Sequence, residues 1–316
     1  MPEENHSVTR PNQPLRETQP APKAVDTHLW PVIPLRPTND CFQQLNQHAI
    51  NGFACDQIPD PIVIQQTTCQ SLLQLMPIAD PAKANQLAET SKEVEVIATV
   101  DHYAHLETLQ KAAASKATKL KVLVAVNSGA NYFGCRPGTE ALQLALACRQ
   151  QANLNFAGLT SEIPAHRTAL DINSDDCAMG ALTGTAAKLQ TCDVNCPMLH
   201  LRTHAPISFS QIPTNWHASF PLQSKSKPEA NPQATSKPFS QQLTATVIAR
   251  PSLRRAVIDC GNQILFPTHQ IILSTSETIP ILHMDPARCV LDMTNVSSEL
   301  KIGQQIQFTL ANCSSQ

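Results

Sequence analysis

Strand-like and helix-like runs alternate through the middle of the chain, and this alternation restricts the possible folds more than any other feature. Continuous apolar runs at 94–100, 120–126 and 154–160 are separated by helix-like stretches at 104–116 and 139–151. Strands joined by helical segments of about 10–15 residues form βαβ units, in which the strands are parallel. The segment therefore predicts a parallel sheet with helices packed against it.

The same alternation begins before residue 94. The run at 71–76 is typical of a strand, and Asp80 follows it as a helix N-cap, with Pro81 at the position where its missing amide is harmless. Several such units in succession favour either a closed barrel or a doubly wound sheet.

The C-terminal part of the chain has a different pattern. Residues 242–316 contain short strand-like runs with little room for helices between them, which predicts a small β domain. The Pro-, Ser- and Lys-rich stretch 222–241 is typical of a flexible linker, and the polar segment 1–24 of a disordered tail. The α/β domain is expected over the remaining residues, 25–221.

Composition excludes several classes of partner. The 316 residues carry a formal net charge of −2, and 15% are charged, which gives no electrostatic footprint for nucleic acid or for a membrane surface. No apolar run approaches the roughly 18 residues that cross a bilayer, and the N-terminal segment lacks the apolar core of a signal peptide. We therefore expect a cytoplasmic protein whose partner is a small molecule or another protein. The eleven cysteines are scattered, and Cys55, Cys148 and Cys260 lie in apolar runs, so we expect buried thiols rather than disulfides.

Residues 121–161 contain a strand, the turn NSGANYFGCRPG, a helix and a second strand. This segment resembles the D-threonine aldolase and D-serine dehydratase family, pyridoxal-phosphate enzymes with an alanine-racemase-like barrel. LLQLMPIADPAKANQLAE, RRAVIDCGNQIL and ELKIGQQIQF resemble further motifs of the same family, in the same order. The resemblance implies an α/β fold: a (β/α)8 alanine-racemase-like barrel, shortened at its N-terminus, followed by the small β domain.

The resemblance also implies a Schiff-base lysine at the end of the first barrel strand, in an RPHxKTH-type motif. The matching stretch here is PLRPTNDCFQQL, in which Thr38, Asn39 and Asp40 occupy the positions of the histidine and the lysine. Amide and carboxylate side chains cannot form the imine with the cofactor. If the chain is active, another lysine must supply it, and Lys83 and Lys188 are the candidates.

The glycine-containing turn keeps its framework but loses its charges. The family has an acidic residue and an arginine where this chain has Asn127 and Tyr132. Gly129, Gly134 and Gly138 remain, and we expect them at turn positions with positive φ, which glycine adopts readily.

The family's phosphate cradle is rich in glycine because backbone amides must approach the anion closely. The corresponding stretch LHLRTHAPISF has no glycine and retains Thr203, and GALTGT at 180–185 is an alternative cradle within a helix-like segment. His166 in GLTSEIPAH is similar to a family histidine, although Glu162 or Ile163 stands where the family has tyrosine.

The divalent metal of the family requires histidines near the C-terminus. ILHMDPARC has Pro286 or Ala287 where the first of them falls, and TLANCSSQ retains only Cys313. One soft ligand does not hold a metal. We therefore assign no catalytic residue, and the vestigial site residues are Tyr132, His166 and Thr203 for the cofactor and Cys313 for the metal.

A separate cluster owes nothing to the resemblance. Cys192, Cys196, His200 and His204 recur every four residues, but Pro197 argues against a helix. On a strand His200 and His204 lie about 13 Å apart, too far for one tetrahedral ion. We therefore favour no metal site here.

These observations predict a degenerate, non-catalytic homologue of the D-threonine aldolases and D-serine dehydratases that has lost both pyridoxal phosphate and metal. The shortened segment 27–51 is expected to leave the barrel without one element, unable to close, and least ordered in its N-terminal fifth. Two alternatives stay open. The chain is either an active pyridoxal-phosphate- and metal-dependent lyase that cleaves or dehydrates D-3-hydroxy amino acids, or a protein-interaction module. The oligomeric state is left open.

Overall fold

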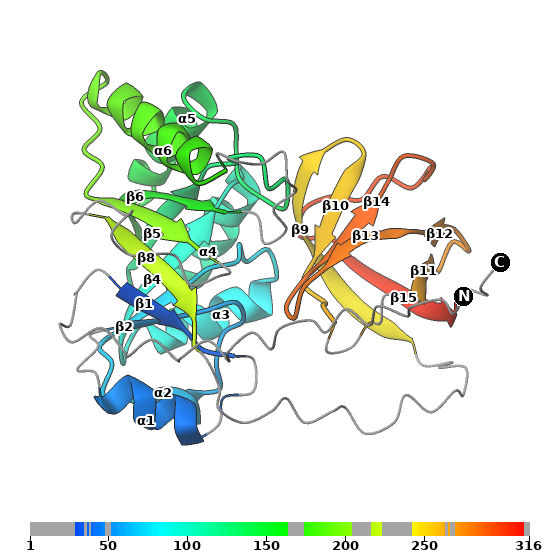
Figure 1. Ribbon diagram of the computed structural model, residues 1–316, viewed down its shortest axis with the longest axis horizontal. Helices are drawn as coiled ribbons and strands as arrows, with labels where there is room; N and C mark the ends of the chain where they lie inside the picture. The colour runs from blue at the N-terminus through cyan, green and yellow to red at the C-terminus, as the bar shows by residue number, and fades with distance from the viewer. Residues whose placement is uncertain are drawn as a thin grey trace, which may run out of the picture.

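The computed structural model describes residues 29–34, 37, 39–47, 52–163, 174–203, 216–222, 242–262, 265 and 269–312. A barrel with helices on its outside lies beside an antiparallel sheet (Figure 1). The expected tail 1–24 lies outside the described residues, as does the expected linker apart from Leu222.

Eight parallel strands form a closed barrel in which each strand pairs with its neighbours in chain order. They are β1 (Leu29–Val32), β2 (Gly52–Cys55), β3 (Ser71–Gln74), β4 (Glu95–Val100), β5 (Leu120–Ala125), β6 (Leu154–Glu162), β7 (Met198–Arg202) and β8 (His217–Pro221). The ring closes where β1 pairs with β8, from Leu29 opposite Ala218 to Val32 opposite Pro221.

The expectation that the barrel cannot close is wrong. β1 lies directly before the stretch that resembles the family's lysine motif, so the strand that was expected to be missing is present. Pro31 in the middle of this four-residue strand explains why the sequence pattern does not reveal it, because proline cannot donate to a strand ladder and argues against a central strand. The shortening of the N-terminus therefore removes no strand of the barrel.

The helices are α1 (Asn39–Gln47), α2 (Pro61–Gln65), α3 (Pro81–Thr90), α4 (Tyr103–Ser115), α5 (Thr139–Arg149) and α6 (Ser174–Gln190). The expected start of α3 is confirmed, since Asp80 Oδ1 accepts hydrogen bonds from the amides of Ala82, at 2.7 Å, and Lys83, at 3.4 Å. Among the described residues no helix combines the length and apolar character that a membrane crossing requires.

Two apolar clusters hold the barrel together. The larger one packs the outer faces of the strands against the helices and includes Leu72, Val96, Leu109, Val122 and Leu144. The smaller one fills the inside of the barrel with Trp30, Ala54, Leu73, Leu75, Ile97 and Leu123, all from β1 to β5 or the residue after β3. Towards the C-terminal ends of β6 to β8 the inner positions are polar, and include the buried Thr160, His200 and Ser219.

The C-terminal β domain is confirmed as an antiparallel sheet with the order β12-β11-β15-β9-β10-β14-β13. Its strands are β9 (Leu243–Ser252), β10 (Arg255–Ile258), β11 (His269–Leu273), β12 (Thr278–Ile279), β13 (Ile281–Met284), β14 (Cys289–Asp292) and β15 (Gln305–Asn312). Its own apolar core includes Val247, Ile258, Ile271, Leu291 and Phe308.

The β domain packs against the barrel near the C-terminal ends of β3 to β5. Met76, Ala125 and Phe133 of the barrel domain share one apolar cluster with Ile248 and Val257 of the β domain. The buried His105 on α4 adds a hydrogen bond between its Nε2 and the carbonyl of Ile248, at 2.9 Å. This packing brings the turn between β13 and β14 to the barrel opening.

The buried positions expected for Cys55, Cys148 and Cys260 are confirmed, and all ten described cysteines are free thiols. Burial raises the pKa of Cys148 to about 12. Burial is also the main reason why the pKa of Cys260 rises to about 11. Such thiols are protonated near neutral pH and are poor nucleophiles.

Candidate functional site

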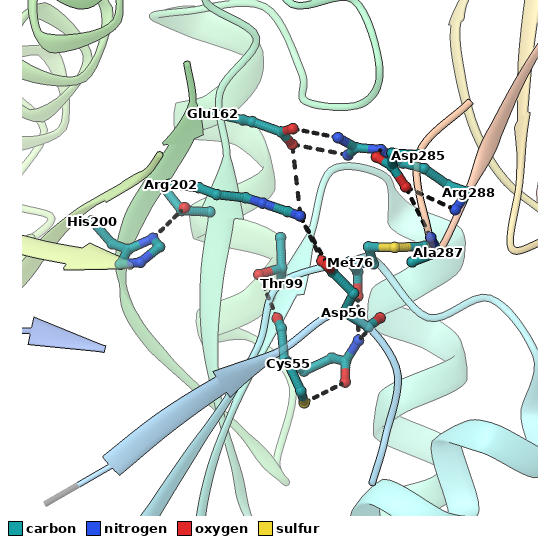
Figure 2. Close-up of polar contacts among 12 residues, drawn as sticks. Cys55, Asp56, Met76, Thr99, Glu162, His200, Arg202, Asp285, Ala287 and Arg288 are labelled. Carbon is teal, nitrogen blue, oxygen red and sulfur yellow. Dashed lines mark hydrogen bonds and ion pairs between the residues drawn. The ribbon is translucent and has the colours of Figure 1, made fainter. Parts of the chain in front are cut away.

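Charged side chains gather at the C-terminal ends of the barrel strands, the barrel mouth (Figure 2). Asp56 follows β2, Glu162 ends β6 and Arg202 ends β7, while Asp285 and Arg288 come from the β13–β14 turn of the β domain. These five residues are called the mouth network below. Active sites of (β/α)8 barrels are built at this face.

Arg288 joins the β domain to the barrel. Its Nη1 donates to Glu162 Oε2 at 2.8 Å, its Nη2 contacts Glu162 Oε1, and its Nε donates to Asp285 Oδ2 at 2.5 Å. Asp285 Oδ1 accepts from the amides of Ala287 and Arg288, at 3.0 Å each, which fixes the turn that carries the guanidinium. Two parallel bonds from one guanidinium to one carboxylate are the strongest form of this pair.

Arg202 extends the network across the barrel. Its Nη2 donates to Asp56 Oδ2 at 2.9 Å, and its Nη1 lies 2.6 Å from Asp56 Oδ1, an ion-pair contact outside hydrogen-bond geometry. The same Nη1 is 3.9 Å from Glu162 Oε2. The chain of charges thus runs Asp56, Arg202, Glu162, Arg288, Asp285.

Three of the five side chains in the network are almost fully shielded from water. The side chains of Arg288, Glu162 and Arg202 are 1%, 5% and 8% exposed. Burial alone opposes the charge on Arg288, but Glu162 and Asp285 outweigh it and hold the pKa of the guanidinium well above its usual value. Three carboxylates face two guanidinium groups, so the network carries one net negative charge.

Aromatic rings cover the outer side of Arg288. Its guanidinium lies 4.4 Å from the ring centre of Tyr132 and 5.2 Å from that of Phe133, within cation–π range. Tyr132 also stacks on His283, with ring centres 4.9 Å apart and planes 17° apart. Burial is the main cause that raises the pKa of the Tyr132 hydroxyl.

The glycine-containing turn lies beside this site, and its expected geometry is confirmed. Gly129, Gly134 and Gly138 have φ values of 111°, 107° and 83°. The amide of Gly134 donates to Asp101 Oδ2 at 2.7 Å, and a Cβ at this glycine would lie 2.6 Å from the amide nitrogen of Asn127. The glycines are therefore explained by the backbone conformation of the turn.

A small cavity borders the network between the barrel and the β domain. It has a volume of about 80 Å³ and is lined by Asp56, Gln74, Met76, Lys83 and Asp259, among others. Pockets for drug-sized ligands have volumes of roughly 300–1,000 Å³. Lys83 Nζ is in direct contact with Asp259 Oδ2, so this lysine is engaged in an ion pair.

The structure brings one predicted site residue into the network's surroundings. Tyr132 lies over Arg288, whereas Thr203 is buried directly after β7 and donates from Oγ1 to the carbonyl of Ser219 at 3.0 Å. His166 and Cys313 lie outside the described residues. Lys188 is exposed on the last turn of α6.

The expected alternative cradle is not at the mouth. Gly180 and Gly184 of the GALTGT stretch lie within α6, where the backbone amides bond along the helix. Asn39 and Asp40 of the lysine-motif stretch begin α1, and residues 35, 36 and 38 of that stretch lie outside the described part.

The cysteine and histidine cluster is divided by the fold. Cys192 is exposed after α6, Cys196 is half-buried, and His200 lies inside the barrel on β7. His200 Nδ1 is 2.7 Å from Thr160 Oγ1, and burial, with smaller contributions from His217 and Arg202, lowers its pKa to about 3. His204 lies outside the described residues, and within the described ones no three His, Cys, Asp or Glu side chains form a potential metal site.

Sequence reasoning missed four members of the mouth network: Asp56, Arg202, Asp285 and Arg288. Glu162 was noticed only as the replacement of a tyrosine. A signal was present, since Asp56, Glu162 and Arg202 each stand at the end of an apolar strand in a chain with 15% charged residues. Charged residues at the C-terminal ends of parallel strands meet at one face of a barrel.

The described residues at the mouth do not fit pyridoxal phosphate. The cofactor needs an amine for its imine, a cradle for its phosphate and room for its ring. Lys83 lines the cavity of about 80 Å³ and is paired with Asp259. A larger opening of about 520 Å³ beside Asp101 and Asn127 has no lysine among its described lining residues. An anionic phosphate would also meet a buried network with an excess of carboxylate, which opposes its entry.

Comparisons with known proteins agree on the fold. A D-threonine aldolase from Filomicrobium marinum is 17% identical, with a TM-score of 0.55 over 91% of this chain and 81% of that one. An alanine racemase from Clostridium difficile 630 in complex with cycloserine is 13% identical, with a TM-score of 0.52 over 89% and 79%. A metal-free D-threo-3-hydroxyaspartate dehydratase C353A mutant is 11% identical, with a TM-score of 0.52 over 91% and 84%.

No curated protein sequence matches the chain. The sequence does match the family described as "Alanine racemase, N-terminal domain" over residues 39–213, more than half of its length. This range runs from α1 through β7, so the match covers the barrel strands β2 to β7. The chain belongs to the alanine racemase N-terminal domain family.

Proposed function

We propose that this chain is a non-catalytic member of its family that has lost both pyridoxal phosphate and the divalent metal used by the D-threonine aldolases and D-serine dehydratases. The observation that carries the proposal is the mouth network. Five ion-paired side chains from the barrel and the β domain lie at the face where a barrel enzyme keeps its reactive groups.

The network supports a structural role for these charges. Each guanidinium is paired with carboxylates on both sides, and Tyr132 and Phe133 cover Arg288 from outside. A catalytic acid or base needs a pKa near the working pH and a path to substrate. Glu162 is 5% exposed and bonded twice to Arg288, so it has no open path to a substrate.

The runner-up is an active lyase on D-3-hydroxy amino acids with Lys83 as the imine-forming residue. The position of Lys83, at the start of α3 beside the mouth cavity, favours it over Lys188. Its ion pair with Asp259 opposes this role, because an imine-forming lysine must be available as the neutral amine.

A titration with pyridoxal phosphate separates the two functions. We expect no saturable visible absorption band and no protein-bound adduct after borohydride reduction, beyond the slow surface labelling that a Lys83→Arg variant shows equally. A D-threonine aldolase serves as the positive control. A yellow complex whose reduced adduct maps to Lys83, and which is lost in Lys83→Arg, would establish the lyase alternative.

The loss of metal has its own test. A ligand that binds only the native state stabilises it by about 2.7 kcal/mol at a hundredfold excess over its dissociation constant. We expect zinc and manganese to leave the melting temperature unchanged. A metal-dependent rise that disappears in Cys313→Ala would contradict the proposal.

A further inference from the structure

A second, larger cavity opens at the opposite end of the barrel, where the strands begin. Its volume is about 390 Å³, and residues from all eight barrel strands line it. This is within the roughly 300–1,000 Å³ of small-molecule pockets, whereas the cavity beside Lys83 is far below it. We propose that this basal cavity binds a small, uncharged, planar aromatic molecule, a function independent of the one proposed for the mouth.

Trp30 forms the anchor of the basal cavity. Its indole packs on Gly52, where an added Cβ would lie 2.4 Å from the ring, and its Nε1 donates to His217 Nδ1 at 3.0 Å. The tryptophan is 6% exposed and belongs to the apolar cluster inside the barrel. The ring is therefore held in one orientation before any ligand arrives, which lowers the entropic cost of binding.

The remaining wall is apolar and only partly covered. Ile97 is buried, whereas Phe156, Ala157 and Met198 are half-buried and line the opening. Ala157 and Met198 pack against the same inner cluster as Trp30. A flat apolar molecule would cover these side chains and the exposed edge of the indole, and the buried apolar area would supply the binding free energy.

The charge at the rim selects an uncharged ligand. Lys121 Nζ and Glu95 Oε2 are 2.5 Å apart, and their side chains are 45% and 44% exposed. This pair neutralises itself, so the described residues of the rim hold no unbalanced charge for an ionic ligand. Ser71 and Asn155 line the same opening and suit one hydroxyl or carbonyl group on the ligand.

Binding at the basal cavity can be followed by the fluorescence of Trp30. The chain has two tryptophans, and Trp216 lies in the outer cluster between strands and helices. In a Trp216→Phe variant all indole emission comes from Trp30. We expect 4-nitrobenzyl alcohol, an uncharged planar aromatic that quenches indole by electron transfer, to quench this emission saturably. Quenching that rises linearly, as for a collision in solution, would overturn the proposal.

Substitutions at the cavity locate the binding. Ala157→Phe fills the cavity and should weaken binding by at least about tenfold, which is about 1.4 kcal/mol. Ala114→Phe, the same change at an exposed position of α4, should leave it unaltered. If Ala157→Phe does not fold, Asn155→Arg at the exposed rim supplies the second variant, and its arm across the opening should also weaken binding. Equal affinity in every folded variant would contradict the site.

The ligand class is tested by charge. 4-Nitrobenzoate has the same ring with a carboxylate, and we expect it to bind at least about tenfold more weakly than the alcohol, because Lys121 is already paired. Equal or tighter binding of the benzoate would overturn the assignment to an uncharged ligand.

Discussion

At the scale of single residues, the arginine of the β13–β14 turn carries its charge in a fully buried environment. Arg288 is the largest fully buried side chain among the described residues, and its charge is tolerated because Glu162 and Asp285 pair with it. Such pairs contribute little net stability when complete, but an unpaired buried charge is costly.

Removing the guanidinium should therefore be strongly destabilising. Arg288→Met keeps much of the apolar volume but leaves Glu162 buried without its bidentate partner, and we expect the free energy of unfolding to fall by about 3–5 kcal/mol. Urea denaturation measures it. Arg136→Met is the control, because this arginine is 87% exposed and its contact with Glu140 is 3.8 Å long; it should change stability by less than about 0.5 kcal/mol. A loss below 1 kcal/mol in Arg288→Met would show that the mouth is wetter than the structure implies.

His200 gives the protein a predictable response to acid. Burial lowers its pKa to about 3, whereas in the unfolded chain it has its ordinary value near 6.5. Between these two values the unfolded state binds the extra proton, so stability falls as the pH falls, by up to about 1.4 kcal/mol per pH unit. A His200→Gln variant should show a shallower loss of unfolding free energy between pH 6 and pH 4. Parallel profiles for the two proteins would mean that the ring is already protonated or solvated in the native state.

At the scale of elements, sequence patterns identified the parts that depend on local physics. Apolar periodicity predicts β3 to β6, α3 to α5 and the strands of the β domain, because the buried apolar residues of each element recur at regular spacing within its own sequence. The Asp80 cap adds the start of α3. β1 escaped this reasoning because Pro31 breaks the pattern, and its pairing with β8 joins residues far apart in the chain. The mouth network could not be predicted either, because it also joins residues far apart in the chain: Glu162 and Arg288 meet only when the two domains pack.

The junction of β6 with its neighbours depends on one glycine. Gly158 has a φ of 145° and follows the register shift between β5 and β6, and a Cβ there would lie 2.0 Å from the carbonyl oxygen of Met198 on β7. We expect Gly158→Ala to lower the free energy of unfolding by about 1–3 kcal/mol. Gly180→Ala in α6, with nothing within 4 Å of the new methyl group, should instead stabilise by about 0.5–1 kcal/mol. Thermal unfolding of the two variants measures both changes. A Gly158→Ala variant as stable as the unsubstituted protein would show that β7 can move away from the new methyl group.

At the scale of the whole molecule, the two ends of the barrel have opposite character. Ion pairs and apolar packing tie the mouth to the β domain, while the basal end keeps a cavity around Trp30. The β domain can therefore separate from the barrel only by exposing both the shared apolar cluster and the buried charge of Arg288. Each of these costs several kcal/mol, so we infer that the two domains unfold together.

Hydrogen exchange tests both the closure of the barrel and this coupling. Because β1 pairs with β8 and β2 on its two sides, the bonded amides of β1 and β2 should exchange only through global unfolding, with the same free energy as those of β4 and β5.

In Arg288→Met the protection of β4, β5, β9 and β10 should fall by one common amount. Early exchange in β1 and β2 would mean that the ring opens locally at its N-terminal strands. A loss of protection confined to β9 and β10 would mean that the β domain unfolds independently of the barrel. The mouth network would then link two domains that fold on their own.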